Sequence, residues 1–188
     1  MTKRFSTSSL ALTIIFASIV SLQSCTKVAK SLDFHLKMQT GSINIIVPAT
    51  NYTTGTATFG PTTAYYNVDS FIKAQTGTLL GIDNVTSVKV VSVTLTINDA
   101  TTANNLANLQ SCFAEFSSDK DTNPFQVNLP NIPDVTASTI SIPVDTSAEL
   151  KSYIGTTFTY SLSAKLRRPT TADMHCTIQY AFNVEVQG

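Results

Sequence analysis

The strongest constraint on the fold is a strict alternation of apolar and polar residues near the C-terminus. Every second residue of 157–166 is apolar, and the residues between them are Thr, Ser or Lys. Successive side chains of a strand lie on opposite faces, so this pattern predicts an antiparallel strand with one buried face. Residues 176–186 repeat the pattern. The turn-rich segment 167–173, in which Pro169 ends the first strand, predicts that the two strands form a long terminal hairpin.

Strand-like segments also precede this pair. Residues 85–97 alternate with a change of parity at Val90–Val91, which predicts a strand with a β-bulge at that point. The chain contains 29 Thr and 20 Ser residues, and Thr suits a half-buried pleated surface. Shorter strands are predicted at 110–117 and 139–144, and further candidates lie at 33–39, 42–47 and 53–59.

Two short helical segments are expected among the strands. Thr146–Glu149 has the spacing of a capping box and is followed by apolar residues at helical spacing up to Ile154. Asp69 predicts the cap of a second helix. Seven or so short strands predict an all-β fold, an antiparallel two-sheet sandwich with one or two short helices. No repeat or low-complexity linker divides residues 33–188, which we expect to form a single β-sandwich domain.

The first 24 residues have the organisation of a signal peptide. Lys3 and Arg4 precede an uncharged apolar run at 10–22. As a helix this run would be about 20 Å long, whereas the hydrocarbon core of a bilayer is about 30 Å thick. The run therefore predicts a signal peptide rather than a spanning helix.

Residues Leu22-Gln23-Ser24-Cys25 resemble the lipobox of bacterial lipoproteins, whose cysteine is diacylated and becomes the new N-terminus. The resemblance implies a lipoprotein signal peptide at 1–24 and a lipidated tether at 25–32, held in a membrane by acyl chains such as palmitate on Cys25. No Asp follows the cysteine, as in lipoproteins sorted outward, which implies the outer membrane and leaves the leaflet open. The alternative is a plain signal peptide before a structural cysteine, which would still give a secreted protein.

A second resemblance rests on the strand at 88–97, the sequence SAELKSYI at 147–154, and the stretch from FTYSLSAKLRRPTT to FNVEV at 158–186. These elements are similar to a group of small uncharacterised Gram-negative lipoproteins with an immunoglobulin-like sandwich. The resemblance implies an immunoglobulin-like fold and an envelope location. It implies no reaction.

Two further cysteines remain if Cys25 carries lipid. Cys112 and Cys176 both fall on the apolar faces of predicted strands. An even number of cysteines in an oxidising compartment permits a Cys112–Cys176 disulfide. Two separate buried thiols fit the same pattern, because a free cysteine packs as a small hydrophobic residue.

Motifs of catalysis or metal binding are absent from the sequence. His35 and His175 are expected at surface or edge positions of strands. Asp119–Asn123 has the D-x-D-x-N spacing of a calcium loop, but Pro124 and Pro130 stand where that loop needs Gly and Glu. An exposed acidic turn is therefore expected, with calcium in another loop geometry as the alternative. We expect no enzyme activity, no cofactor and no metal.

Candidate ligand contacts are the tyrosines of a Thr-rich stretch, Tyr52, Tyr65 and Tyr66, since sugar rings stack on aromatic faces and the chain has no Trp. Core or edge positions are the alternative, and an extended chain cannot expose both Tyr65 and Tyr66. Arg167–Arg168 at a turn could meet anionic headgroups or an acidic partner.

Charge and composition narrow the class of partner. The chain has 12 basic and 12 acidic residues and no net charge, so it lacks the cationic surplus that binds nucleic acid. The sequence favours a membrane-anchored, non-catalytic envelope module that binds a protein or glycan partner. A carrier of lipid or another small apolar ligand is the alternative. An enzyme assembled from distant strands without a recognisable motif is the third.

Overall fold

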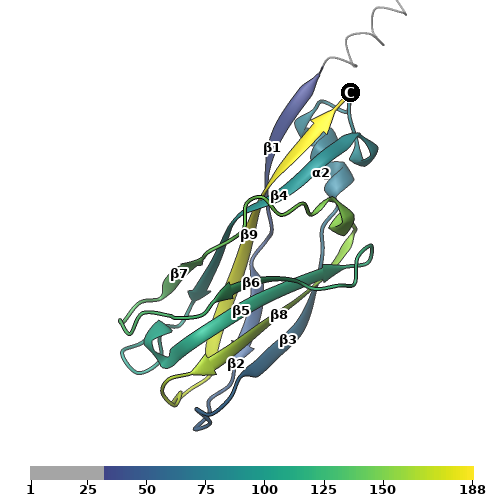
Figure 1. Ribbon diagram of the computed structural model, residues 1–188. Helices are drawn as coiled ribbons and strands as arrows, with labels where there is room; N and C mark the ends of the chain where they lie inside the picture. The colour runs from purple at the N-terminus through teal and green to yellow at the C-terminus, as the bar shows by residue number, and fades with distance from the viewer. Residues whose placement is uncertain (1–31) are drawn as a thin grey trace, which may run out of the picture.

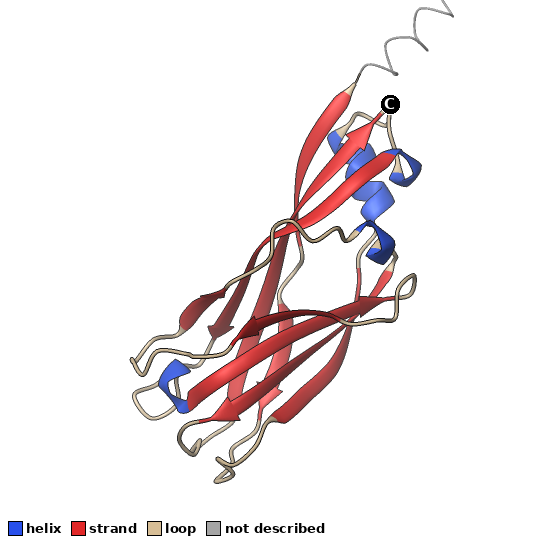
Figure 2. Ribbon diagram, viewed as in Figure 1, coloured by secondary structure: helices blue, strands red, loops and turns tan. Residues whose placement is uncertain are grey.

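The computed structural model describes residues 32–188, which form two antiparallel β-sheets packed face to face (Figures 1 and 2). The first sheet contains β1 (Asp33–Gln39), β2 (Ile43–Val47), β4 (Val85–Ile97), β7 (Thr139–Ile142) and β9 (Met174–Gln187). The second sheet contains β3 (Ala57–Tyr65), β5 (Leu109–Ser118), β6 (Phe125–Leu129) and β8 (Thr157–Leu166). The expected all-β, two-sheet antiparallel sandwich is confirmed. The predicted signal peptide and the tether up to residue 31 lie outside the described residues.

The strand order is more specific than the sequence pattern. In the first sheet β1 and β2 both pair with β9, followed by β4 and β7, and the second sheet runs β3-β8-β5-β6. Thus β2 pairs with β9, β3 with β8, β4 with β7 and β5 with β6, as if one long hairpin were wrapped around the core. This is the order of a jelly roll, whereas immunoglobulin sheets have the order ABED and CFG. The immunoglobulin-like order implied by the resemblance is therefore not the observed one. Alternating strands are common to both architectures, so the sequence pattern could not distinguish them.

The predicted terminal hairpin is wrong. β8 pairs with β3 and β5, while β9 pairs with β1, β2 and β4, so the two strands face each other from opposite sheets. Their alternation correctly identifies the buried residues, because both apolar rows point into the same core. It cannot identify the partner strand. Residues 167–173 cross from one sheet to the other, a spacing of about 10 Å in sandwiches.

The long strands β4 and β9 extend beyond the second sheet. There β9 pairs with β1 on one side and with β4 on the other, and α2 (Val68–Gln75) lies at the same end, so the molecule narrows toward the end that holds both the start of β1 and the C-terminus (Figures 1 and 2). We call this the terminal end and the opposite end the loop end. The register of β4 against β9 shifts between Val90 and Ser92, which confirms the predicted bulge.

Some local predictions need correction. The helix expected from Ser147 to Ile154 is only the 3₁₀ turn η3 (Lys151–Tyr153), because the Glu149 side chain bonds to β4 instead of capping a helix. The second helix exists as α2, but its cap is Asn67. Two more 3₁₀ turns are η1 (Ile82–Asn84) and η2 (Leu106–Asn108). No helix within residues 32–188 is both long and apolar enough to span a membrane.

Candidate functional site

Four connections gather at the loop end, opposite α2 and the C-terminus (Figure 1). They join β2 to β3, β4 to β5, β6 to β7, and β8 to β9. Backbone contacts tie them together, because Thr50 forms a bridge with Thr170 and Leu106 N donates to Ala137 O at 3.0 Å. The loop end is therefore one connected surface rather than four independent loops.

Three buried asparagines brace this surface. Asn104 Nδ2 donates to Thr171 Oγ1 at 2.9 Å and Asn104 Oδ1 accepts from Thr171 N at 2.8 Å. Asn108 Nδ2 donates to Pro169 O at 2.9 Å, and Asn105 Oδ1 accepts from Ala107 N at 2.9 Å. Buried amides with satisfied hydrogen bonds fix the geometry of the groups around them. Sequence reasoning missed these residues, since Asn in a loop is ordinary.

The basic pair of the sequence divides into two roles. Arg167 is partly buried, and its guanidinium group donates to Ala107 O at 3.2 Å and to Ile132 O at 2.5 Å. Arg168 is half-exposed and donates to both carboxylate oxygens of Asp134, at 2.7 and 2.6 Å. Arg168 is therefore the more exposed of the pair, and both guanidinium groups lie within ion-pair distance of Asp134.

Tyr52 is the one candidate tyrosine at the loop end. Its side chain is 59% exposed and borders an apolar hollow of about 500 Å³, open mouth included, with Phe59 on one wall. The hollow exists because Ala57 and Ala164, which pair in register, have small side chains. The Tyr52 ring lies over Gly55, whose φ of +87° favours glycine. Tyr52 thus offers an aromatic face beside an apolar depression.

Tyr65 and Tyr66 lie at the other end of β3. Tyr65 is 83% exposed, whereas Tyr66 turns inward and packs against Phe71 with ring centroids 6.3 Å apart. Burial raises the pKa of Tyr66. The opposed orientations agree with the prediction that both could not face outward. The three tyrosines do not form one aromatic surface.

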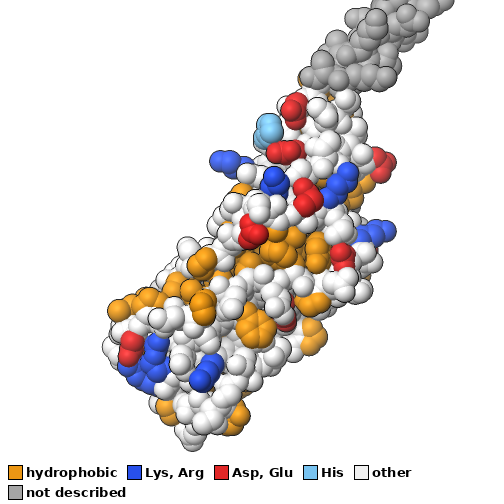
Figure 3. Space-filling view, viewed as in Figure 1, with side chains coloured by type: hydrophobic (Ala, Val, Ile, Leu, Met, Phe, Trp, Pro, Cys, Tyr) orange, Lys and Arg blue, Asp and Glu red, His pale blue; other side chains and the backbone are white. Residues whose placement is uncertain are grey.

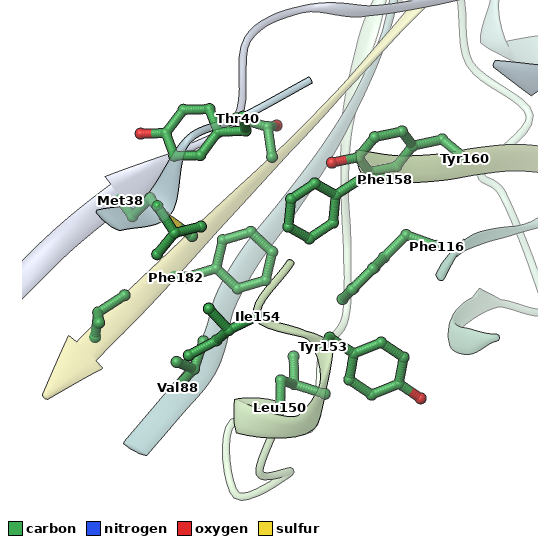
Figure 4. A pocket seen from close by; sticks show the side chains of 13 residues that line it. Met38, Thr40, Val88, Phe116, Leu150, Tyr153, Ile154, Phe158, Tyr160 and Phe182 are labelled. Atoms are coloured by element: carbon green, nitrogen blue, oxygen red, sulfur yellow. The ribbon is translucent and has the colours of Figure 1, made fainter. Parts of the chain in front are cut away.

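A second hollow lies where the second sheet meets the narrow extension (Figure 4). Its lining is almost wholly apolar: Phe116 and Phe158 from the second sheet, Met38 and Phe182 from the first, and Ile154 from the segment after η3. We call it the junction hollow. It measures about 480 Å³ with its open mouth, but the space inside that is free for solvent is only about 30 Å³. On the face seen in Figure 3, hydrophobic side chains form a band across the middle of the molecule.

The wall of the junction hollow formed by residues 145–156 is fastened by carboxylates. Glu149 accepts from Val88 N at 2.8 Å and from Ser87 Oγ at 2.7 Å. Asp121 accepts from Ser152 Oγ at 2.9 Å, and Asp119 accepts from Thr156 N at 2.9 Å. Polar bonds on the outside of the segment therefore hold its apolar side chains over the hollow.

These bonds also explain the acidic turn Asp119–Asn123. The backbone N–H groups of Thr157 and Thr156 lower the pKa of Asp119, and the hydroxyl of Ser152 lowers that of Asp121. Both carboxylates thus serve as internal acceptors. Within residues 32–188, no group of three or more His, Cys, Asp or Glu side chains is arranged to hold a metal ion.

Both histidines are exposed on the outer face of the first sheet. His175 Nδ1 lies 2.6 Å from Asp99 Oδ2, and this hydrogen bond raises the pKa of His175 and lowers that of Asp99. His35 Nε2 lies 3.9 Å from Asp33 Oδ2, and His35 Nδ1 lies 3.7 Å from Glu185 Oε1. The two histidines occupy different parts of the sheet, so they form no common site.

The two remaining cysteines face the core from opposite sheets, Cys112 on β5 and Cys176 on β9. Both are free thiols, so the disulfide considered from the sequence is not formed and the alternative of two buried thiols describes them. Burial raises the pKa of each to about 12. A thiol rather than a thiolate at neutral pH is a poor nucleophile.

Comparison with known proteins gives distant structural likenesses only. No protein-family model and no curated protein sequence matches the chain. A structure of infectious bursal disease virus Gx strain matches 85% of this chain at 11% identity and a TM-score of 0.39, and this chain spans about a third (33%) of it. Desmodium yellow mottle tymovirus matches 82% of this chain and 90% of its own at 12% identity and a TM-score of 0.28. A mud crab tombus-like virus structure matches 82% of each chain at 12% identity and a TM-score of 0.30.

Proposed function

We propose that the protein is a membrane-anchored, non-catalytic envelope lipoprotein whose loop end binds a protein or glycan partner. The observation that supports this most is the position of the loop end. The described chain starts at the opposite end, where Gly188 N donates to Leu32 O at 3.1 Å. Residues 25–31 could span about 25 Å at most. An anchor on Cys25 would hold the terminal end near the membrane and direct the loop end away from it.

The loop end has the properties of a binding surface. The asparagine network holds its backbone in one geometry, so little ordering entropy would be lost on binding. Its exposed groups include an aromatic ring, an aliphatic side chain and a charge pair: Tyr52, Val135 and Arg168 with Asp134. Aromatic residues and Arg are enriched where proteins contact partners.

The anchor is tested by fractionation of the Cys25→Ser variant. Acylation requires the thiol, so we expect the wild-type protein in the membrane fraction and the variant in the soluble envelope fraction. A variant that remains membrane-bound would contradict the anchor.

The binding surface is tested by placing a photo-crosslinking residue at position 52 or at position 65. Both native tyrosines are well exposed, but only Tyr52 lies at the loop end. We expect one dominant protein or glycan adduct from position 52 and none from position 65. Adducts from position 65 alone, or equal adducts from both, would contradict a loop-end site.

A second candidate function, carriage of a lipid or another small apolar ligand, is favoured by the junction hollow. Its lining would suit a hydrocarbon group, but the space as it stands holds little more than one water, so the 145–156 wall would have to move. Saturable binding of a fluorescent fatty acid, lost when Ile154→Trp fills the hollow, would support the carrier. No saturable binding, or binding unaffected by the substitution, would refute it.

A further inference from the structure

The turn between α2 and η1 pushes one leucine into solvent. Gly77 and Thr78 both have left-handed backbone conformations, with φ of +62° and +67°. This conformation is uncommon for a β-branched residue such as Thr. It places Leu80 in the core, 3% exposed, and leaves its neighbour Leu79 61% exposed.

Hydrogen bonds hold the turn in this form. Thr78 N donates to Lys73 O at 2.7 Å, which closes the end of α2. Thr76 Oγ1 donates to Ile72 O at 2.9 Å and accepts from Leu80 N at 3.3 Å. Because Thr76 is itself buried, the turn is anchored in the body of the protein. Leu79 therefore projects from a turn that hydrogen bonds hold in one conformation.

The turn lies beside the point where the described chain begins. η1 follows the turn, and Asn84 Nδ2 donates to Gln187 O at 3.1 Å. Gly188, the next residue, donates its N–H to Leu32 O at 3.1 Å. Figure 1 shows α2, the start of β1 and the C-terminus at this same end. An anchor on Cys25, about 25 Å of chain away at most, would keep the turn close to the lipid surface.

We propose that Leu79 inserts into the surface of the membrane and fixes the orientation of the sandwich above it; this rests on the anchoring in the proposed function. The charges near the turn offer no attraction to anionic headgroups, so the contact with lipid would be apolar. Lys73 is paired with Asp69 at 2.6 Å, and the next acidic residue, Asp83, lies in η1. With no cationic surplus in the turn, insertion should not require anionic lipid.

The chain contains no Trp, so a Leu79→Trp variant carries a single reporter. Val135→Trp is the matched control, because Val135 is 57% exposed and lies at the loop end. Each full-length lipidated variant is reconstituted into phosphatidylcholine vesicles with or without brominated phosphatidylcholine. We expect the indole emission of the Leu79→Trp variant to shift to the blue and to lose at least half its intensity to the bromine quencher, whereas the control keeps its emission.

The outcomes separate the two proposals. Unquenched emission from the Leu79→Trp variant, in protein that floats with the vesicles, would overturn the insertion of Leu79 and leave the anchor intact. Protein that does not float with the vesicles would overturn the anchor itself. Quenching that appears only after anionic lipid is added would contradict insertion by apolar contact.

Discussion

Truncation of Phe116 should be among the most damaging single changes in the sandwich. Phe116 is 2% exposed, and its ring centroid lies 5.3 Å from those of both Tyr153 and Tyr180 and 5.4 Å from that of Phe125. Removal of a buried phenyl group loses its transfer free energy and leaves a cavity. Phe116→Ala should therefore lower the free energy of unfolding by about 3–5 kcal/mol.

Phe113 on the same strand provides the matched control. It lies on the opposite face of β5 and is only partly buried, so Phe113→Ala should cost less than about 1 kcal/mol. For a domain of this size the Phe116 change corresponds to a fall in Tm of roughly 6–20 °C. Urea unfolding followed by far-UV circular dichroism gives the free energies, and near-UV circular dichroism reports the tyrosines around Phe116. Equal losses for the two variants would refute the assignment of faces on β5.

Three further predictions concern ionisable groups. The hydrogen bond between His175 and Asp99 raises the pKa of His175 above 6.5 and lowers that of Asp99 below 3.8. Their pairing should therefore stabilise the fold between pH 3.8 and 6.5, and this stabilisation should be lost as the pH rises through the His175 pKa or falls through the Asp99 pKa. Asp99→Asn should lower the His175 pKa measured by NMR, and an unchanged value would refute the pairing. Cys112 and Cys176 should react with a thiol reagent only after unfolding; rapid reaction in the native protein would contradict their burial. Burial alone would raise the pKa of Glu149, but hydrogen bonds from Val88 N, Ser87 Oγ and Lys151 N together outweigh it and lower the pKa. Glu149→Gln should therefore speed amide hydrogen exchange in residues 150–156, and unchanged exchange would contradict the role of Glu149 in holding this segment.

The sequence predicts where the strands lie and which of their faces is buried better than it predicts which strands pair with each other. The strand at 157–166 and the one at 33–39 agree with β8 and β1, because an apolar residue at every second position has few other uses. The same alternation could not show that β8 and β9 lie in different sheets. β6 was missed, because Pro124 and Pro130 leave only a short apolar pattern between them.

The candidate sites depend still more on tertiary structure. The junction hollow draws its lining from residues as distant in sequence as Met38 and Phe182, so no local pattern marks it. The asparagine network likewise requires the β4–β5 and β8–β9 connections to meet. Tyr52 could be selected in advance as an aromatic residue in a polar loop, but its separation from Tyr65 follows only from the length of β3.

The lipid anchor on Cys25 is tested by the intact mass of the chain extracted from membranes. We expect a polypeptide that begins at Cys25 and carries the mass of a diacylglycerol group, with or without a further acyl chain, on that residue. An unmodified polypeptide that begins at Met1, or one cleaved elsewhere without lipid, would contradict the anchor and with it the proposed orientation of the loop end.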